Sequence, residues 1–110
     1  MANKELFCEV NIKLQPLKFD ENIDAKLEYY LIEEVYKNDE ETGEEFNTFG
    51  VEVVKKEYLQ NNIINIETNS ASHLLFERLK AKQLLDDLSK NTVTPIGLYD
   101  VLDNLIGISY

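Results

Sequence analysis

Apolar and polar residues alternate along the first half of the chain, and this alternation predicts β-strands. In residues 5–15, ELFCEVNIKLQ, one face holds Leu6, Cys8, Val10, Ile12 and Leu14. A period of two over this length is typical of a strand with one face in water. Pro16 ends the strand, because proline cannot donate to the hydrogen-bond ladder. Similar patterns predict three further strands over residues 26–37, 46–58 and 61–68.

The second predicted strand, KLEYYLIEEVYK, is apolar on both of its faces. Leu27, Tyr29, Leu31 and Val35 lie on one face, whereas Tyr30, Ile32 and Tyr36 lie on the other. Phe7 is the one large apolar side chain on the polar face of the first strand. A helix over residues 26–37 is the weaker alternative, because strand patterns flank it and aromatic and branched residues favour strands.

The hydrophobic period changes to that of a helix after residue 70. A predicted helix over residues 71–90, which Ser70 or Ser72 can cap, places on one face Leu74, Ala81, Leu84, Leu85 and Leu88. A second helix over residues 95–106 has Thr94 as its N-cap and Pro95 at its first position, and Gly107 can close it. Its apolar stripe is made by Leu98, Val101, Leu102, Leu105 and Ile108.

These elements predict one α+β domain over residues 1–110. Four strands with short connections favour an antiparallel meander, because parallel strands need long crossovers. Two amphipathic helices can cover its apolar face and complete a two-layer fold. With the helices on one side, Tyr30, Ile32, Tyr36 and Phe7 are expected to share the other face of the sheet.

The charge is concentrated in one segment. The 110 residues carry a formal net charge of −10, and residues 20–57 hold thirteen acidic residues against four lysines. Such a segment repels nucleic acid and anionic lipid, so we expect neither as a partner. The chain has one cysteine, no apolar run of a signal peptide, and no stretch near the ~18 apolar residues that span a bilayer. These features predict a cytoplasmic protein.

Candidate chemistry is sparse, and the sequence predicts neither an enzyme nor a cofactor. Cys8 lies on the apolar face of a strand, where a thiol is usually inert packing, and His73 lies in the first turn of a predicted helix. The acidic cluster of residues 39–45 lacks the ligand spacing of a calcium loop. The four glycines stand too far apart for a phosphate-binding loop. We therefore expect no catalytic, metal or cofactor site.

Two motifs carry a resemblance to a known family. The first is Phe49, Gly50, Val51 and Glu52, and the second is Val93, Thr94, Pro95, Leu98, Asp100 and Val101. Over about residues 26–107 the chain resembles a family of small uncharacterised proteins of low-GC Gram-positive bacteria, a domain of unknown function. Where that family often has histidine before the leucine of the second motif, this chain has Gly97. The resemblance implies no activity.

The remaining feature is the apolar second face of the sheet. Tyrosine is common at interfaces, because it buries a large area with few rotatable bonds and keeps a polar tip. Tyr30, Ile32, Tyr36 and Phe7 therefore predict a surface for a protein partner or a second copy of the chain, unless a terminus or a loop half covers this face. One alternative is that the acidic segment imitates nucleic acid and blocks a basic protein. Another is a small enzyme that uses scattered carboxylates.

Overall fold

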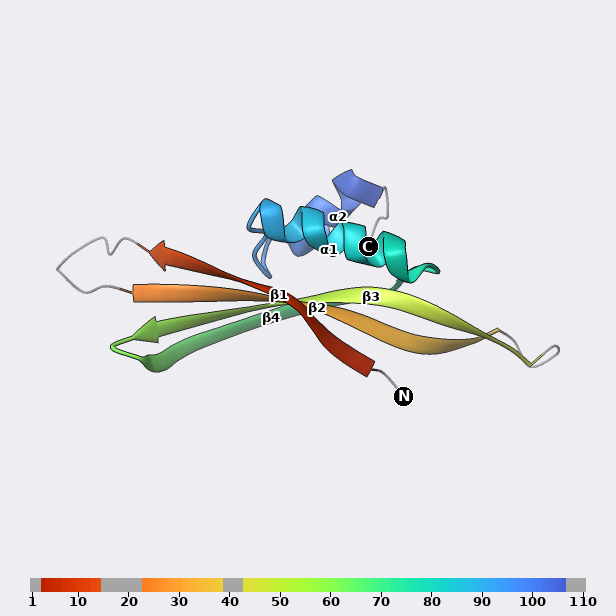
Figure 1. Cartoon of the computed structure of the whole chain (residues 1–110), viewed down its shortest axis with the longest axis horizontal. Helices are drawn as coiled ribbons and strands as arrows, with labels where there is room; N and C mark the ends of the chain where they lie inside the picture. The colour runs from red at the N-terminus through yellow and green to blue at the C-terminus, as the bar shows by residue number, and fades with distance from the viewer. Residues whose placement is uncertain (1–2, 15–22, 39–42, 107–110) are drawn as a thin grey trace.

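The computed structural model describes residues 3–14, 23–38 and 43–106, which form a sheet of four strands followed by two helices (Figure 1). The elements are β1 (Asn3–Leu14), β2 (Ile23–Asn38), β3 (Glu44–Leu59), β4 (Asn62–Leu75), α1 (Arg78–Lys90) and α2 (Leu98–Ile106). The strands lie in the order β1-β2-β3-β4 and each pair is antiparallel. The predicted α+β meander with two C-terminal helices is confirmed.

The helices cover only the middle of one face of the sheet, and the strands run beyond them in both directions (Figure 1). We call the covered side the helix face and the other side the open face. α1 packs across all four strands, mainly β1, β2 and β3, and α2 lies against β4. The sheet and the helices bury between them Leu27, Tyr29, Leu31, Phe49, Val51, Val53, Ala71, Leu74, Ala81, Leu84, Leu85, Leu88, Val93, Leu98 and Leu102.

A β-bulge in β1 changes the face on which its first residues lie. Leu6 pairs with Tyr30 and Cys8 pairs with Tyr29, so one residue of β1 is extra between them. Because successive strand residues point to opposite faces, Leu6 lies on the open face and Cys8 on the helix face. Phe7 is half-buried and packs against the core. Its expected place on the open face is therefore wrong.

The first helix begins later than the hydrophobic pattern predicts. Ala71 and Leu75 pair with Val51 and Phe49 of β3, so residues that we expected in a helix extend β4 instead. Leu74 is buried in this strand, as it would be in a helix, so the pattern alone cannot distinguish the two. The N-cap of α1 is Glu77, which makes no side-chain capping hydrogen bond, and not Ser70 or Ser72.

The second helix also begins a turn after its predicted start. The amide of Gly97 donates to the carbonyl of Thr94 at 3.1 Å, and the amide of Leu98 donates to the carbonyl of Pro95 at 3.3 Å. These bonds close a turn before α2, whose apolar side chains Leu98 and Leu102 are buried. The expected closure at Gly107 lies outside the described residues.

Tyr29 joins the sheet to the loop between the helices. Its side chain is fully buried, and its hydroxyl donates to the carbonyl of Val93 at 2.9 Å. Removing that hydroxyl leaves a buried carbonyl without its partner, which costs about 1–3 kcal/mol. We expect Tyr29→Phe to lower the free energy of unfolding by about that amount in denaturant titrations. Tyr99→Phe, which removes an exposed hydroxyl from the carbonyl of Ser70, should cost less.

The same hydroxyl predicts a loss of stability in alkali. Burial, with the nearby Cys8 thiolate adding to it, raises the pKa of Tyr29 from 10.0 to about 12. The unfolded chain releases this proton near pH 10 and the folded chain retains it to about pH 12, so folding is favoured below pH 10 and less so above it. The free energy of unfolding should fall between pH 10 and pH 12, and less steeply in Tyr29→Phe. Equal slopes would contradict the assignment.

Candidate partner-binding surface

The structure does not gather the four predicted contact residues into one apolar surface. Tyr30 and Ile32 lie in the middle of the open face, where Tyr30 is half-buried and Ile32 is only 8% exposed. Phe7 packs against the core on the other side. Tyr36 lies on the open face far along β2, and it is 47% exposed. Of the four, Tyr36 is thus the side chain that the surface presents.

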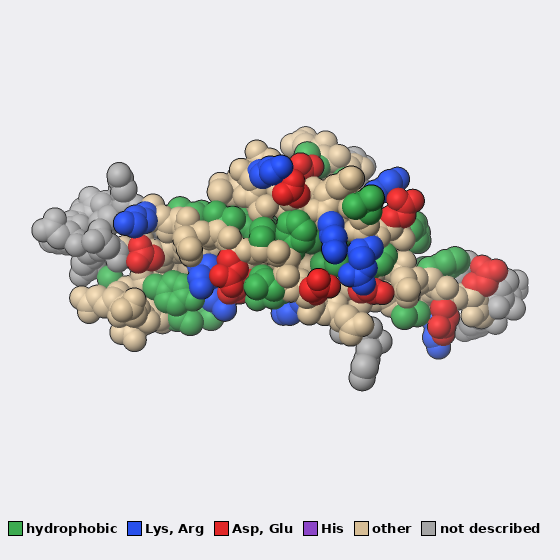
Figure 2. All heavy atoms as spheres, viewed as in Figure 1, with side chains coloured by type: hydrophobic (Ala, Val, Ile, Leu, Met, Phe, Trp, Pro, Cys, Tyr) green, Lys and Arg blue, Asp and Glu red, His purple; other side chains and the backbone are tan. Residues whose placement is uncertain are grey.

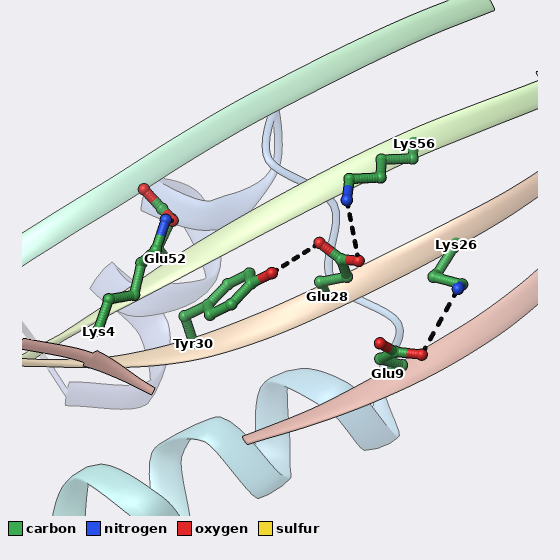
Figure 3. Close-up of polar contacts among 7 residues, drawn as sticks. All are labelled: Lys4, Glu9, Lys26, Glu28, Tyr30, Glu52 and Lys56. Carbon is green, nitrogen blue, oxygen red and sulfur yellow. Dashed lines mark hydrogen bonds and ion pairs between the residues drawn. The ribbon is translucent and has the colours of Figure 1, made fainter. Parts of the chain in front are cut away.

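The middle of the open face is polar, because the hydroxyl of Tyr30 and its neighbours form a cross-strand network (Figure 3). The Glu28 carboxylate accepts hydrogen bonds from the Tyr30 hydroxyl at 2.8 Å and from the Lys56 ammonium at 3.2 Å. Burial, followed by the hydrogen bond and charge of Glu28, raises the pKa of Tyr30 to about 12. At neutral pH the hydroxyl therefore keeps its proton and donates it within the network.

Further ion pairs continue this polar region on both sides. The Lys4 ammonium lies 2.9 Å from the Glu52 carboxylate and 4.8 Å from the centre of the Tyr30 ring, and Lys26 lies 3.6 Å from Glu9. With the Tyr30 network, these ion pairs make the middle of the open face polar, so it is not an apolar docking surface. Figure 2 shows acidic and basic side chains next to one another also on the flank of the molecule that faces the viewer.

An apolar cleft opens at the end of the open face that lies toward the β2–β3 hairpin. Its volume is about 700 Å³, and its lining is Tyr36, Phe46, Thr48, His73 and Phe76, which we call the aromatic cleft. Tyr36 and Phe46 face each other across β2 and β3. The Tyr36 and His73 rings meet edge to face at 5.5 Å, and the Phe46 and Phe76 rings do so at 6.4 Å. Such pairs stabilise one another beyond their buried area.

Gly50 allows the backbone arrangement that builds this cleft. Between the pairs Phe49–Leu75 and Val51–Ala71, β4 contains two residues more than β3. The extra length bends β4 back over Gly50, where a Cβ atom would overlap the carbonyl oxygen of Ala71. His73 lies in the bend with a φ of 55°, a left-handed conformation that histidine adopts more readily than most residues. The bend is what carries its ring to the cleft.

Thr48 fixes the orientation of the His73 ring. The Thr48 hydroxyl donates to the carbonyl of Glu34 at 3.2 Å, and its oxygen lies 2.6 Å from Nδ1 of His73. A hydroxyl has one proton to donate, so the network assigns the other proton to Nδ1 of the ring, which donates to Thr48. Nε2 of neutral His73 is then a hydrogen-bond acceptor. Thr48 itself is 3% exposed.

The hairpin that carries the cleft is strongly acidic. Residues 33–45 contain seven acidic residues and one lysine. Lys37 lies 3.7 Å from the Glu45 carboxylate, so part of this charge is compensated locally. The tip of the hairpin, residues 39–42, lies outside the described residues, and with it most of the predicted acidic cluster. Among the described residues of this hairpin, four glutamates stand against one lysine, so the end of the sheet that carries the aromatic cleft is negatively charged.

The other candidate chemistry is not assembled in the described part of the chain. Cys8 and His73 lie on β1 and β4, the opposite edges of the sheet, which three strand spacings of ~4.8 Å separate. Within residues 3–14, 23–38 and 43–106, no three His, Cys, Asp or Glu side chains converge as a metal site. No helix among these residues is long and apolar enough to span a membrane.

Comparison with known proteins places the chain in a family. A model of a family of unknown function, DUF6514, matches residues 9–107. The chain belongs to the DUF6514 family. Both motifs that carry the resemblance lie within the match, and one of them contains Gly50, on which the bend in β4 depends. No curated protein and no solved structure matches the chain.

Most of the lining of the aromatic cleft does not follow from the sequence pattern of this DUF6514 member. Phe46 and Thr48 alternate with Gly50 along β3, so their common face could be read from the period of two. The hydrophobic pattern predicts His73 and Phe76 in a helix, whereas their contact with β3 depends on the bend in β4. The bend depends on the close approach of the β3 and β4 backbones at Gly50. The hydrophobic pattern does not indicate this approach.

Proposed function

We propose that this DUF6514 protein is a non-catalytic binding protein of the cytoplasm that holds a segment of a partner protein in its aromatic cleft. The observation that carries the proposal is the exposure of the aromatic lining. Phe76, Tyr36 and Phe46 are 73%, 47% and 37% exposed. Apolar side chains grouped in this way on a soluble protein mark binding sites, whereas scattered ones need no explanation.

The chemistry of the cleft indicates what the partner segment contains. A cleft of about 700 Å³ lies within the ~300–1,000 Å³ range of ligand sites, and its aromatic walls suit an aromatic or large aliphatic side chain. Nε2 of His73 can accept one hydrogen bond at its edge. Because the hairpin has a net charge of −6 over residues 33–45, Lys or Arg should flank the apolar anchor.

Two features favour binding over catalysis. The Thr48 hydroxyl directs its proton to a backbone carbonyl, so His73 does not activate it as a nucleophile. The open-face carboxylates Glu28 and Glu52 are each paired with a lysine. This pairing argues against catalysis by these carboxylates. It also argues against a row of unpaired carboxylates that imitates nucleic acid. The free thiol of Cys8 is compatible with a reducing compartment.

Titration with synthetic peptides, followed by the amide resonances of the protein, tests the proposal. A peptide with a central Phe between lysines should shift the amides of residues 46–48 and 72–76, with a dissociation constant of about 1 mM or lower. Replacing its Phe by Ala, or its lysines by glutamates, should weaken binding at least about fivefold, and added salt should weaken it too.

Matched variants of the protein assign the binding to the cleft. Phe76→Ala should weaken binding by about fivefold or more, because it removes an exposed wall of the cleft. Ile96→Ala alters a side chain that is 81% exposed but lies away from the cleft, and it should leave binding unchanged. Shifts confined to other regions, or equal effects of the two variants, would overturn the proposal.

A further inference from the structure

The two edges of the sheet differ sharply in charge. β1 carries four charged residues among twelve, and Lys4, Glu5 and Glu9 make ion pairs with neighbouring elements. β4 has fourteen residues and contains one acidic residue, Glu67, and no Lys, Arg or Pro. Natural proteins block sheet edges with charges, lysines and prolines, because unpaired backbone groups there can bind another strand. By this measure β1 is protected and β4 is not.

Part of the β4 edge is covered by the chain itself. The Tyr99 hydroxyl donates to the carbonyl of Ser70 at 2.9 Å, and the Asn69 amide donates to the carbonyl of Pro95 at 3.0 Å. These bonds hold α2 and the loop before it against the strand at Asn69 and Ser70. Residues 62–68 precede this covered part, and six of their seven side chains are exposed.

The uncovered segment is also apolar. Ile63, Ile64 and Ile66 are 51%, 50% and 53% exposed. Ile63 pairs with Tyr58 and Ile66 pairs with Lys56. Tyr58 and Lys56 are two residues apart and lie on the same face, so Ile63 and Ile66 share that face too. An exposed edge strand with clustered isoleucines is a typical site for strand addition.

We infer that a second copy of the chain pairs with residues 62–68 of β4, antiparallel about a two-fold axis, to form a continuous sheet of eight strands. Charge selects this edge for a second copy. Each copy carries a net charge of −10, so most surfaces of two copies repel one another, whereas residues 58–66 carry no charge at all. Two-fold pairing also sets the isoleucine-rich segment against itself, so that the same apolar residues cover each other.

This interface is independent of the aromatic cleft. Phe46, near the start of β3, lines the cleft, whereas Leu59 ends β3 beside the turn into β4. The cleft and the uncovered β4 segment therefore lie beside opposite ends of β3. Either site can be altered without the other, and the failure of one proposal leaves the other standing.

Sedimentation equilibrium over a concentration series tests the inference. The mass should rise with concentration from 12.8 kDa toward twice that value. Ile66→Lys places a charge on the uncovered edge and should weaken self-association at least about tenfold. Leu79→Lys adds the same charge on α1, at a site that is 67% exposed and away from the β4 edge, and should not. A monomer throughout the series, or equal weakening by both variants, would overturn the inference.

Hydrogen exchange and cross-linking locate the contact. Amides of residues 62–68 should become more protected as the concentration rises, whereas those of β1 should not. In a Cys8→Ser background, Asn65→Cys should form a disulfide-linked dimer on mild oxidation, because a two-fold axis near the middle of the segment brings like positions together. Self-association with protection on β1, and with no cross-link on a scan of positions 62–68, would show that the interface lies elsewhere.

Discussion

Gly50→Ala is expected to lower the free energy of unfolding by about 3 kcal/mol or more. The added Cβ would overlap the carbonyl oxygen of Ala71 and lie 2.9 Å from Cα of Ser72. Both are backbone atoms of β4, so no side-chain rotation relieves the overlap and one strand must move. Urea unfolding followed by circular dichroism measures the loss.

Two other glycines serve as controls for this substitution. A Cβ at Gly97 would lie 3.7 Å from the Thr94 hydroxyl oxygen, an ordinary contact, so Gly97→Ala should change stability by about 0.5 kcal/mol or less. Gly43 has a φ of 63° with no atom near its Cβ position, so Gly43→Ala should cost about 1–2 kcal/mol through backbone conformation alone. A cost for Gly50→Ala no larger than that of Gly97→Ala would show that β3 and β4 are not this close.

The same substitution should disturb the aromatic cleft. Movement of β4 away from Gly50 carries the bend at His73 with it and breaks the contact between Nδ1 and the Thr48 hydroxyl. The ring then loses the neighbour that fixes its tautomer. In folded Gly50→Ala protein, the nitrogen chemical shifts of His73 should show a mixture of tautomers, whereas the wild-type protein should show the proton on Nδ1.

The strands could be predicted because their hydrophobic pattern is unambiguous. In β2, Leu27, Tyr29 and Leu31 are all buried against the helices, and a period of two leaves no other arrangement for them. Tyr30 and Ile32, on the other face, predict an exposed apolar surface that binds a partner. Their pattern carried no sign that Glu28 and Lys56 would hold the Tyr30 hydroxyl and its surroundings in a polar network.

The errors arise where one tertiary contact changes the local geometry. The bulge beside Phe7 adds one residue to β1, and nothing in the alternation of residues 5–15 marks it. Residues 70–77 contain Leu74 at a position that is buried in a strand or a helix alike. Pairing of Ala71 with Val51 decides between the two, and that pairing depends on the whole sheet. Because His73 lies in the bend of β4, the aromatic cleft also depends on this pairing.

Leu85→Ala is the other substitution with a large expected effect. Leu85 is fully buried on the sheet-facing side of α1. Truncation of a buried leucine to alanine costs ~2.7–5 kcal/mol, through lost apolar transfer and the cavity that remains. We expect a loss near the middle of that range in urea unfolding, with an unchanged dependence on denaturant. Leu79→Ala, in the same helix at a site that is 67% exposed, should cost about 0.5 kcal/mol or less.

The Leu85 comparison also separates stability from binding. α1 and Leu85 lie on the helix face, whereas the aromatic cleft opens on the open face of the same sheet. Leu85→Ala should therefore weaken folding but leave peptide binding by the folded fraction unchanged, and Phe76→Ala should do the reverse. If Leu85→Ala costs no more than Leu79→Ala, the helices are not packed on the sheet as described. If it also abolishes binding where the chain is still folded, the two faces are coupled and the cleft is not an independent site.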